Sequence, residues 1–406
     1  LIIIINLSFA CVSPDSYFST GEEFYELKEY EKAIEYYSEA IKLKPDFAEA
    51  FRKRGASKCK LKRYDEAIID FDSALKINTN DEKAHFGKAK AFKALKRFTD
   101  SKLEVIAVLK INPQFAKAYL LRGELLIEEK DYKNALLSIN KGIDLEADNS
   151  YGYFIRAELK NKTKDYNGAI LDYTNAIRFD SLNDMYYYFR GFAKEILYDI
   201  NGAIDDYSKA IEIKPNDAEY YSSRGNLKFE LNDLIGALAD WSKSSQLNPG
   251  NIDIYFDMAD VNLELKDYTK IISDMNKVIV LDPNNFDAYS YRGYSNSMLD
   301  NFTAAIKDYT KCIEFKPNAA ELFFNRGNVR GKNKDFDGAI SDYDKAIELD
   351  SLFSEAFCKR GMTKMTIFDR EGGYSDLKKA ESMGSQRAKD LIIKYNLWLK
   401  HHTPNT

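Results

Sequence analysis

Residues 184–217 read DMYYYFRGFAKEILYDINGAIDDYSKAIEIKPND, and residues 320–353 read AELFFNRGNVRGKNKDFDGAISDYDKAIELDSLF. The two stretches align without a gap and share an aromatic residue, Arg, Gly, Ala, Asp and Tyr at the same places. The same spacing, or a multiple of it, relates one row of glycines: Gly21, Gly55, Gly123, Gly191, Gly225, Gly293, Gly327 and Gly361. A fixed period of this length indicates a repeat architecture, in which each unit buries its apolar face against the next.

Composition narrows the classes of function. The chain has 406 residues, of which 45% are hydrophobic and 30% charged, so it is neither disordered nor a multispanning membrane protein. The net charge of -5 is too small to indicate a nucleic-acid partner by itself. Four cysteines exclude a disulfide scaffold, and three histidines leave little material for histidine-based catalysis or metal binding.

Each copy of the repeat is predicted to form two helices. The period runs over residues 14–385, with copies that start at residues 14, 48, 82, 116, 150, 184, 218, 252, 286, 320 and 354. Asp233 and Asp335 stand where they can cap the second helix of a copy, and Pro residues such as Pro215 end it. Gly at position 8 falls inside the first helix, where it costs about 1 kcal/mol relative to Ala. We therefore expect two helices to approach closely at that position.

The pattern resembles the tetratricopeptide repeat family, which has an aromatic residue at position 4, Gly or Ala at 8, Ala at 20 and 27, an aromatic at 24 and Pro at 32. Position 4 is Tyr17, Phe51, His85, Tyr119, Tyr153, Tyr187, Tyr221, Tyr255, Tyr289, Phe323 and Phe357, so only His85 departs. The resemblance implies an all-α fold: a right-handed superhelical solenoid of about eleven 34-residue helix-turn-helix repeats. Position 20 departs from Ala at Ser101, Ile271 and Gly373, where we expect local bends or looser packing.

Residues 386–406 follow the last copy and are predicted to form a capping helix and tail. Their apolar residues at 388, 391, 392, 395 and 399 make one helical stripe. Such a helix covers the core that the last repeat of a solenoid would otherwise expose.

A charged pair recurs with the repeat. Position 7 is Arg54, Arg122, Arg156, Arg190, Arg224, Arg292, Arg326 and Arg360, and position 23 is Asp70, Asp172, Asp206, Asp240, Asp274, Asp308, Asp342 and Asp376. Copy three keeps both charges as Lys88 and Glu104. We interpret the two positions as structural ion pairs, either within a repeat or between neighbours; the sequence fits both arrangements.

No catalytic or metal site is expected. His85 occupies an aromatic packing position, and His401 and His402 have no Cys or acidic residue near them in the sequence. Cys59, Cys312 and Cys358 lack metal-binding spacing, and the chain has no glycine-rich phosphate loop or nucleophile elbow. The sequence therefore predicts a protein that is not an enzyme and needs no cofactor.

The resemblance implies that positions 2, 5, 9, 12 and 13 of each first helix face a ligand in the concave groove. The predicted binding residues are Arg52, Lys60, Lys83, Phe86, Lys90, Lys93, Lys117, Phe154, Tyr188, Phe192, Glu195, Glu219, Phe229, Glu230, Asp253, Phe256, Asp260 and Glu264. Residues 48–98 contain 14 Lys and Arg against 7 Asp and Glu, whereas the later groove residues are mostly acidic. Such polarity would orient an extended partner, with the aromatic residues as anchors. The family's carboxylate clamp for chaperone tails is not matched, because position 9 is Ala56 and Lys90 instead of Asn.

Residues 1–13 are predicted to be a signal or lipoprotein-type segment. Leu1 to Cys11 reads LIIIINLSFAC, which is too short to span a bilayer but suits the apolar core of a secretory signal. Ser8 and Ala10 occupy the small-residue positions before Cys11. This cysteine therefore resembles a lipidation site that would tether the protein to a membrane. The expected location is the periplasm or a membrane-anchored lipoprotein, with a cytoplasmic location as the alternative.

Together these features predict a non-enzymatic scaffold that binds a protein or extended peptide in its concave groove, in a bacterial cell envelope. The alternative is a structural solenoid that self-assembles within a larger complex; the sequence leaves the oligomeric state open. Nucleic-acid binding through the basic copies two and three is disfavoured, because the rest of the chain is acidic.

Overall fold

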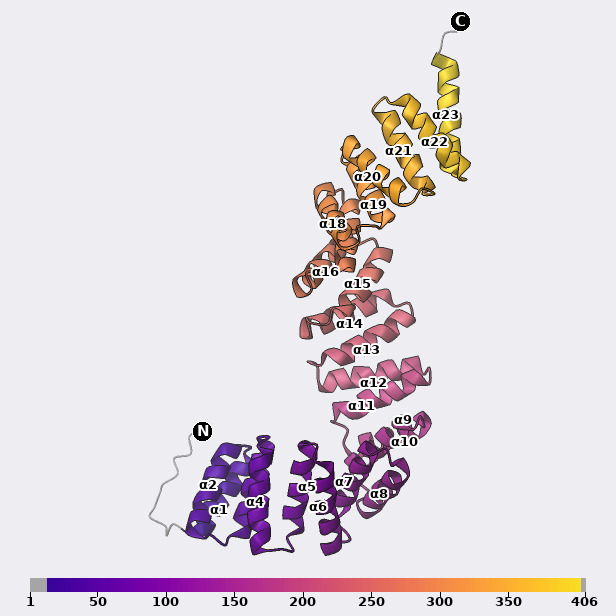
Figure 1. The fold of residues 1–406 in the computed structure, drawn as a ribbon. Coiled ribbons are helices and arrows are strands. Elements are labelled where there is room, and N and C mark those ends of the chain that lie inside the picture. Colours follow the sequence, from indigo (N-terminus) through magenta and orange to yellow (C-terminus); the bar gives the residue numbers. More distant parts are fainter. Residues whose placement is uncertain (1–12, 403–406) are drawn as a thin grey trace. The chain divides into compact units, whose positions relative to one another are not determined.

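The computed structural model of the chain describes residues 13–402, and every regular element in that range is a helix (Figure 1). The helices are α1 (Pro14–Glu26), α2 (Tyr30–Leu43), α3 (Ala48–Lys60), α4 (Tyr64–Ile77), α5 (Glu82–Ala94), α6 (Phe98–Ile111), α7 (Ala116–Glu128), α8 (Tyr132–Leu145), α9 (Ser150–Lys162), α10 (Tyr166–Phe179), α11 (Asp184–Ile196), α12 (Ile200–Ile213), α13 (Ala218–Glu230), α14 (Leu234–Leu247), α15 (Asp253–Glu264), α16 (Tyr268–Leu281), α17 (Phe286–Met298), α18 (Phe302–Phe315), α19 (Ala320–Lys332), α20 (Phe336–Leu349), α21 (Ser354–Thr366), α22 (Arg370–Ser382) and α23 (Gln386–His402). The predicted all-α repeat fold is confirmed.

The chain divides into two compact units. Unit 1 ends at Pro215 and contains α1 to α12, and unit 2 begins at Asn216 and contains α13 to α23. Within each unit an odd-numbered helix packs against the even-numbered helix that follows it, and that helix packs against the next pair. Each unit is therefore a stack of helix pairs whose odd-numbered helices are the first helices of the repeats.

The turn between the two helices of each pair contains a residue with a left-handed backbone conformation. Position 15 has a positive φ in all eleven copies, including Lys28 (62°), Tyr198 (61°) and Phe368 (66°). The residue after it is often an Asp that caps the second helix, and Asp233 Oδ1 accepts a hydrogen bond from the Gly236 amide at 2.9 Å. The predicted Asp caps are thus confirmed, and the residue before each cap reverses the chain.

Close helix approach explains the glycines at position 8. A Cβ atom placed on Gly21 would lie 2.7 Å from the Tyr37 ring, and one on Gly327 would lie 2.8 Å from the Tyr343 ring. Because these contacts are shorter than any normal carbon–carbon approach, the rings of Tyr37 and Tyr343 pack on bare glycine backbone; in the fifth copy Tyr173 packs against Ala157 instead. The buried ring and the glycine together set the distance between the two helices of a repeat.

The recurring charged pair acts both within and between repeats. Arg190 forms two parallel hydrogen bonds to Asp206, with its Nη2 2.6 Å from Oδ1 and its Nε 2.9 Å from Oδ2. Its Nη1 also donates to Thr174 of the preceding repeat at 3.1 Å, and Lys194 lies 2.8 Å from the same Asp206. The pairs are Arg54–Asp70, Arg156–Asp172, Arg190–Asp206, Arg224–Asp240, Arg292–Asp308, Arg326–Asp342 and Arg360–Asp376. This row is called the arginine ladder below.

Copies that depart from the pattern use other contacts. His85 is partly buried at position 4, and its Nδ1 lies 2.5 Å from Glu104 Oε2. The polar ring replaces an aromatic one because Glu104 takes the ladder position beside it. Ser101 and Ile271 are fully buried, and the Ser101 hydroxyl donates to the Ala89 carbonyl at 2.7 Å, so these sites are not exposed by the loss of Ala.

The last helix, α23, covers the end of unit 2. Ala388 and Ile392 are buried against Leu377 and Ala380 of α22. The Tyr395 ring lies 5.8 Å from the Tyr374 ring, measured between centroids. These contacts come from the predicted apolar stripe and close the core of the last repeat.

Candidate functional site

Two adjoining cavities lie along the first helices of unit 1. The larger has a volume of about 570 Å³, the smaller about 430 Å³, and both are lined by Phe86, Lys90 and Ala94. The larger is also lined by Lys93, Lys117, Leu120, Leu121, Glu124, Asn149 and Tyr151, and the smaller by Tyr25, Arg52, Ala56, Cys59, Lys60, Tyr64, Phe71, Lys83, Gly87 and Ala91. These residues are called the unit 1 groove. It crosses α3, α5 and α7 and reaches the start of α9.

The groove follows from the repeat. Position 2 of two successive first helices supplies Lys83 and Lys117, position 5 supplies Arg52, and position 9 supplies Lys90 and Glu124. Because equivalent positions of stacked helices lie side by side, residues separated by one repeat line a continuous surface. Small residues open this surface: Ala56 and Ala94 occupy groove positions where a larger side chain would fill the space.

The groove is cationic. It is lined by the basic side chains of Arg52, Lys60, Lys83, Lys90, Lys93 and Lys117, against the single carboxylate of Glu124. Arg52 is balanced by Glu49 at 2.7 Å and Asp81 at 3.2 Å. Lys93 pairs with Glu124.

Four groove lysines have no carboxylate close enough to form an ion pair in the described part of the chain. Within residues 13–402, no carboxylate lies within 4 Å of the amines of Lys60, Lys83, Lys90 or Lys117, and all four side chains are exposed. Two other lysines on the same helices are paired: Lys58 lies 2.7 Å from Asp70, and Lys88 lies 2.7 Å from Glu104. The groove therefore gathers four lysines whose charge no carboxylate of the described residues offsets.

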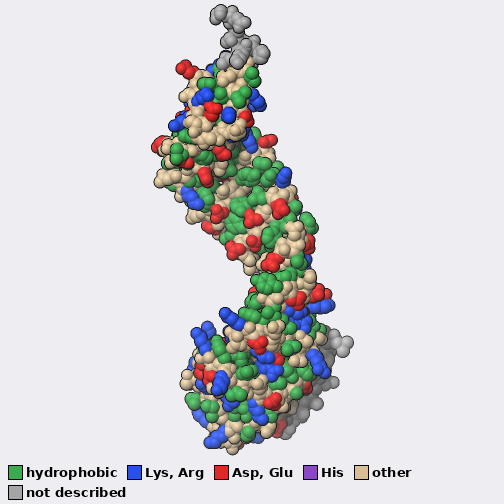
Figure 2. All heavy atoms as spheres, turned by 90° about the vertical axis from the view of Figure 1, so that its right-hand side faces the viewer, with side chains coloured by type: hydrophobic (Ala, Val, Ile, Leu, Met, Phe, Trp, Pro, Cys, Tyr) green, Lys and Arg blue, Asp and Glu red, His purple; other side chains and the backbone are tan. Residues whose placement is uncertain are grey.

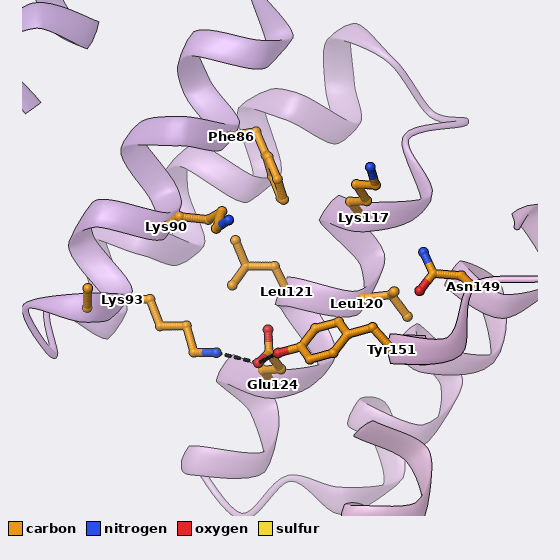
Figure 3. A pocket seen from close by; sticks show the side chains of 10 residues that line it. Phe86, Lys90, Lys93, Lys117, Leu120, Leu121, Glu124, Asn149 and Tyr151 are labelled. Carbon is orange, nitrogen blue, oxygen red and sulfur yellow. Dashed lines mark hydrogen bonds and ion pairs between the residues drawn. The ribbon is translucent and has the colours of Figure 1, made fainter. Parts of the chain in front are cut away.

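The floor of the larger cavity is apolar. Leu120 and Leu121 are buried in the core of unit 1 but present side-chain atoms to the cavity beside Phe86 (Figure 3). Tyr151 closes the side toward α9, and its hydroxyl donates to Glu124 Oε1 at 2.7 Å. Figure 3 shows Lys93, Glu124 and Tyr151 joined in one chain of polar contacts beneath Leu121.

Cys59 and Tyr151 of the groove have raised pKa values. Burial raises the pKa of the Cys59 thiol to about 11, although Lys90 and Lys60 oppose the shift. Burial, followed by the charge of Glu124, raises the pKa of Tyr151. At neutral pH the thiol is therefore protonated and a poor nucleophile, and the phenol serves as a hydrogen-bond donor.

The remaining predicted residues of unit 1 do not line these cavities. Phe154 packs between other rings, 5.2 Å from Tyr186 and 5.9 Å from Phe189, so it supports the fold. Tyr188 packs 5.5 Å from Tyr207, whose hydroxyl donates to Glu195 at 2.5 Å. Phe192, in contrast, is 42% exposed on α11.

Unit 2 carries acidic side chains at the equivalent positions. On α15, Asp253, Asp260 and Glu264 are exposed, and Phe256 packs 5.7 Å from the Tyr291 ring. Glu219 and Glu230 are exposed on α13, where Phe229 is 45% exposed. The unit 2 cavities of about 360 and 240 Å³ are lined by other residues. On the face drawn in Figure 2, Lys and Arg are frequent over unit 1, and Asp and Glu lie among hydrophobic side chains over unit 2.

The sequence prediction, which chose charged and aromatic residues, left out part of the groove. Glu124, Tyr151 and Leu120 stand at positions 9, 2 and 5, which the family pattern already assigns to the groove. Ala94 stands at position 13. Reading every residue at these positions, and not only the charged and aromatic ones, would have found them.

No group of His, Cys, Asp and Glu side chains within residues 13–402 is arranged to hold a metal ion. In the same range, no helix combines the length and the apolar character that crossing a membrane requires. Cys11 lies outside the described residues.

Comparisons with known proteins agree on the repeat. The family described as TPR repeat matches residues 21–62 and 199–232, and families described as tetratricopeptide repeat match residues 116–149, 252–285 and 320–351. No curated protein sequence matches significantly.

The chain is also similar to several solved structures. YrrB, described as a TPR protein with an unusual peptide-binding site, is 24% identical, with 46% of this chain and 96% of YrrB covered and a TM-score of 0.40. Yeast Tom70 is 17% identical, with 95% of each chain covered and a TM-score of 0.34. PilF of Pseudomonas aeruginosa is 16% identical, with 52% of this chain and 97% of PilF covered and a TM-score of 0.48. From its repeats, its family matches and its helix pairs, the chain belongs to the tetratricopeptide repeat proteins.

Proposed function

We propose that this protein is a non-enzymatic scaffold that holds a segment of another protein in the unit 1 groove. Tetratricopeptide repeats generally bind protein or peptide partners. The observation that carries the proposal is the combination of a cavity with an apolar floor and lysines that, within residues 13–402, have no carboxylate partner. Exposed apolar surface bordered by polar side chains marks interaction sites in soluble proteins.

The dimensions of the groove favour an extended segment over a small molecule. Packed helices lie about 8–10 Å apart, so the path from α3 across α5 and α7 to α9 is on the order of 25–30 Å. An extended chain covers about 3.3 Å per residue, and the groove therefore accommodates about eight or nine residues. A drug-sized ligand would occupy only one of the two cavities.

Selection from an unbiased peptide library tests the proposal. Peptides that bind the full chain are measured by fluorescence anisotropy against two variants, Ala94→Trp and Ala304→Trp. Ala94 borders both groove cavities, whereas Ala304 is an exposed residue of α18 in unit 2. We expect the Trp at 94 to weaken binding at least 10-fold and the Trp at 304 to leave it unchanged. Peptides that bind both variants equally well would contradict the groove assignment.

A second candidate function is self-assembly. It is favoured by one observation: the unit 1 groove is cationic, and α15 of unit 2 carries Asp253, Asp257, Asp260 and Glu264 along one side. Opposite charges on two parts of one chain permit contact between two copies. Light scattering at rising protein concentration and low salt tests this, and a mass that stays monomeric throughout would reject it.

The proposal extends to a place in the bacterial cell envelope. Its support is the apolar run from Leu1 to Cys11, with small residues before the cysteine. The test is the mass of the N-terminal peptide of the protein from its native source. A diacylated Cys11 is the expected result, and an unmodified chain that extends upstream of Leu1 would contradict it.

A further inference from the structure

We propose that the segment held in the unit 1 groove is acidic and carries one apolar anchor side chain. Its carboxylates lie against Lys60, Lys83 and Lys90, and its anchor enters the larger cavity between Phe86 and Tyr151. This inference rests on the proposed function, because it names the partner of the same groove.

The charge argument begins with the lysines. Lys60 on α3 and Lys83 and Lys90 on α5 all line the smaller cavity, which no carboxylate lines. Like charges held close together repel one another, and within residues 13–402 nothing neutralises these three amines. A partner that brings carboxylates would relieve the repulsion and gain attraction, and the charges would also speed its approach.

The direction of the segment follows from Glu124. This carboxylate pairs with Lys93 and accepts a hydrogen bond from Tyr151, so the α7–α9 side of the groove carries one paired lysine and the single groove lysine Lys117. A carboxylate of the partner placed beside Tyr151 would be repelled by Glu124. The acidic residues of the segment therefore concentrate over α3 and α5, and the apolar residue lies toward α7.

The anchor argument rests on the cavity floor. Leu120 and Leu121 are only 2% and 4% exposed, yet both line a cavity of about 570 Å³ together with Phe86 and Ala94. A Leu or Phe side chain placed there would be removed from water against aliphatic and aromatic atoms. Burial of such a side chain corresponds to roughly a 10- to 100-fold gain in affinity.

A nucleic acid would use the lysines but not the floor. Bases stack on exposed aromatic faces, whereas the floor here is formed largely by leucine side chains beside a carboxylate. The observations therefore favour an acidic peptide, and a nucleic acid becomes an outcome of the test.

The test uses the peptides selected on the full chain and two triple variants with equal changes in net charge. The groove variant is Lys60→Glu, Lys83→Glu, Lys90→Glu. The matched control is Lys76→Glu, Lys133→Glu, Lys141→Glu, at exposed lysines that do not line the groove. We expect selected peptides to contain Asp or Glu beside a Leu, Ile, Met or Phe.

Binding should fall on the order of 30-fold for the groove variant and change less than about 2-fold for the control. Replacing the anchor residue of the peptide by Ala should weaken binding at least about 10-fold. Helical circular dichroism of both variants verifies that they fold.

The remaining outcomes separate the two proposals. Peptides that Ala94→Trp blocks, but that lack acidic residues or bind the groove variant equally well, would overturn this inference and leave the proposed function standing. Peptides indifferent to Ala94→Trp would overturn both. A single-stranded 20-mer RNA that displaces the peptides at lower concentration, with a steep salt dependence, would replace the acidic segment by a nucleic acid.

Discussion

Unit 1 and unit 2 share a scaffold and differ on the surface that it carries. The arginine ladder runs through both, with Arg190–Asp206 in unit 1 and Arg326–Asp342 in unit 2 at the same geometry. At the groove positions, unit 1 has unpaired lysines around an apolar cavity, whereas α15 of unit 2 has a row of carboxylates. The comparison separates residues that hold a repeat together from residues that select a partner.

Breaking the ladder should give the largest effect. Asp206 is 3% exposed and balances both Arg190 and Lys194, so Asp206→Ala leaves two partly buried charges without a partner. We expect the α11–α12 pair to lose about 3 kcal/mol of stability, measured by hydrogen–deuterium exchange of its amides. In the fourth copy Ser138 takes the place of Asp, and Ser138→Ala should lose only about 1 kcal/mol. Equal losses would show that the ladder charge is not what stabilises the repeat.

Reversing the charge of α15 in unit 2 tests whether peptide binding needs the apolar cavity as well as positive charge. The variant Asp253→Lys, Asp257→Lys, Asp260→Lys makes α15 basic without adding an apolar floor. We expect acidic peptides to gain less than about 5-fold in affinity, with no dependence on their anchor residue, because exposed ion pairs contribute about 0.2–1 kcal/mol each. Anisotropy titrations measure this, and anchor-dependent binding to the new site would mean that charge alone defines the groove.

The turns offer a smaller effect that should be equal in both units. Tyr198 in unit 1 and Phe368 in unit 2 have positive φ angles and are 87% and 81% exposed. Tyr198→Gly and Phe368→Gly should each stabilise their unit by about 0.5 kcal/mol, because glycine adopts this conformation without a Cβ clash. Tyr198→Ala keeps the Cβ atom and should give no gain in the thermal midpoint. A gain for Ala equal to that for Gly would point to removal of the exposed ring instead.

The smallest effect concerns pH. Burial raises the pKa of Asp257, and the charges of Asp253 and Asp260 add to the shift. Because the pKa of Asp257 is higher in the folded than in the unfolded state, the protonated side chain favours the folded state relative to the ionised one. This contribution to the free energy of unfolding is fully present below the unfolded-state pKa and is lost as pH rises through the folded-state pKa. Asp257→Asn should therefore stabilise unit 2 by roughly a few tenths of a kcal/mol at pH 7 and not at pH 3. Thermal melts at the two pH values check this, and an equal gain at both would exclude titration as the cause.

Most of the scaffold could be predicted from the sequence, and only part of the groove. Gly327 and Tyr343 represent positions 8 and 24, where every copy has Gly or Ala opposite a bulkier side chain because the two helices of a repeat approach closely there. The cavity depends instead on which side chains are small, such as Ala94, and on how far Leu121 reaches, which differ between repeats. The left-handed turn residues were not predicted either, because Lys and Tyr at position 15 give no sign of a positive φ.

The most direct test of the account is to locate the anchor of a bound peptide. A selected peptide carrying a photoreactive phenylalanine analogue at its anchor position is cross-linked to the full chain, and the attachment site is mapped by mass spectrometry. The account predicts attachment at Phe86, Leu121 or Tyr151, which line the larger cavity. Attachment on the even-numbered helices of unit 1, or anywhere in unit 2, would contradict it.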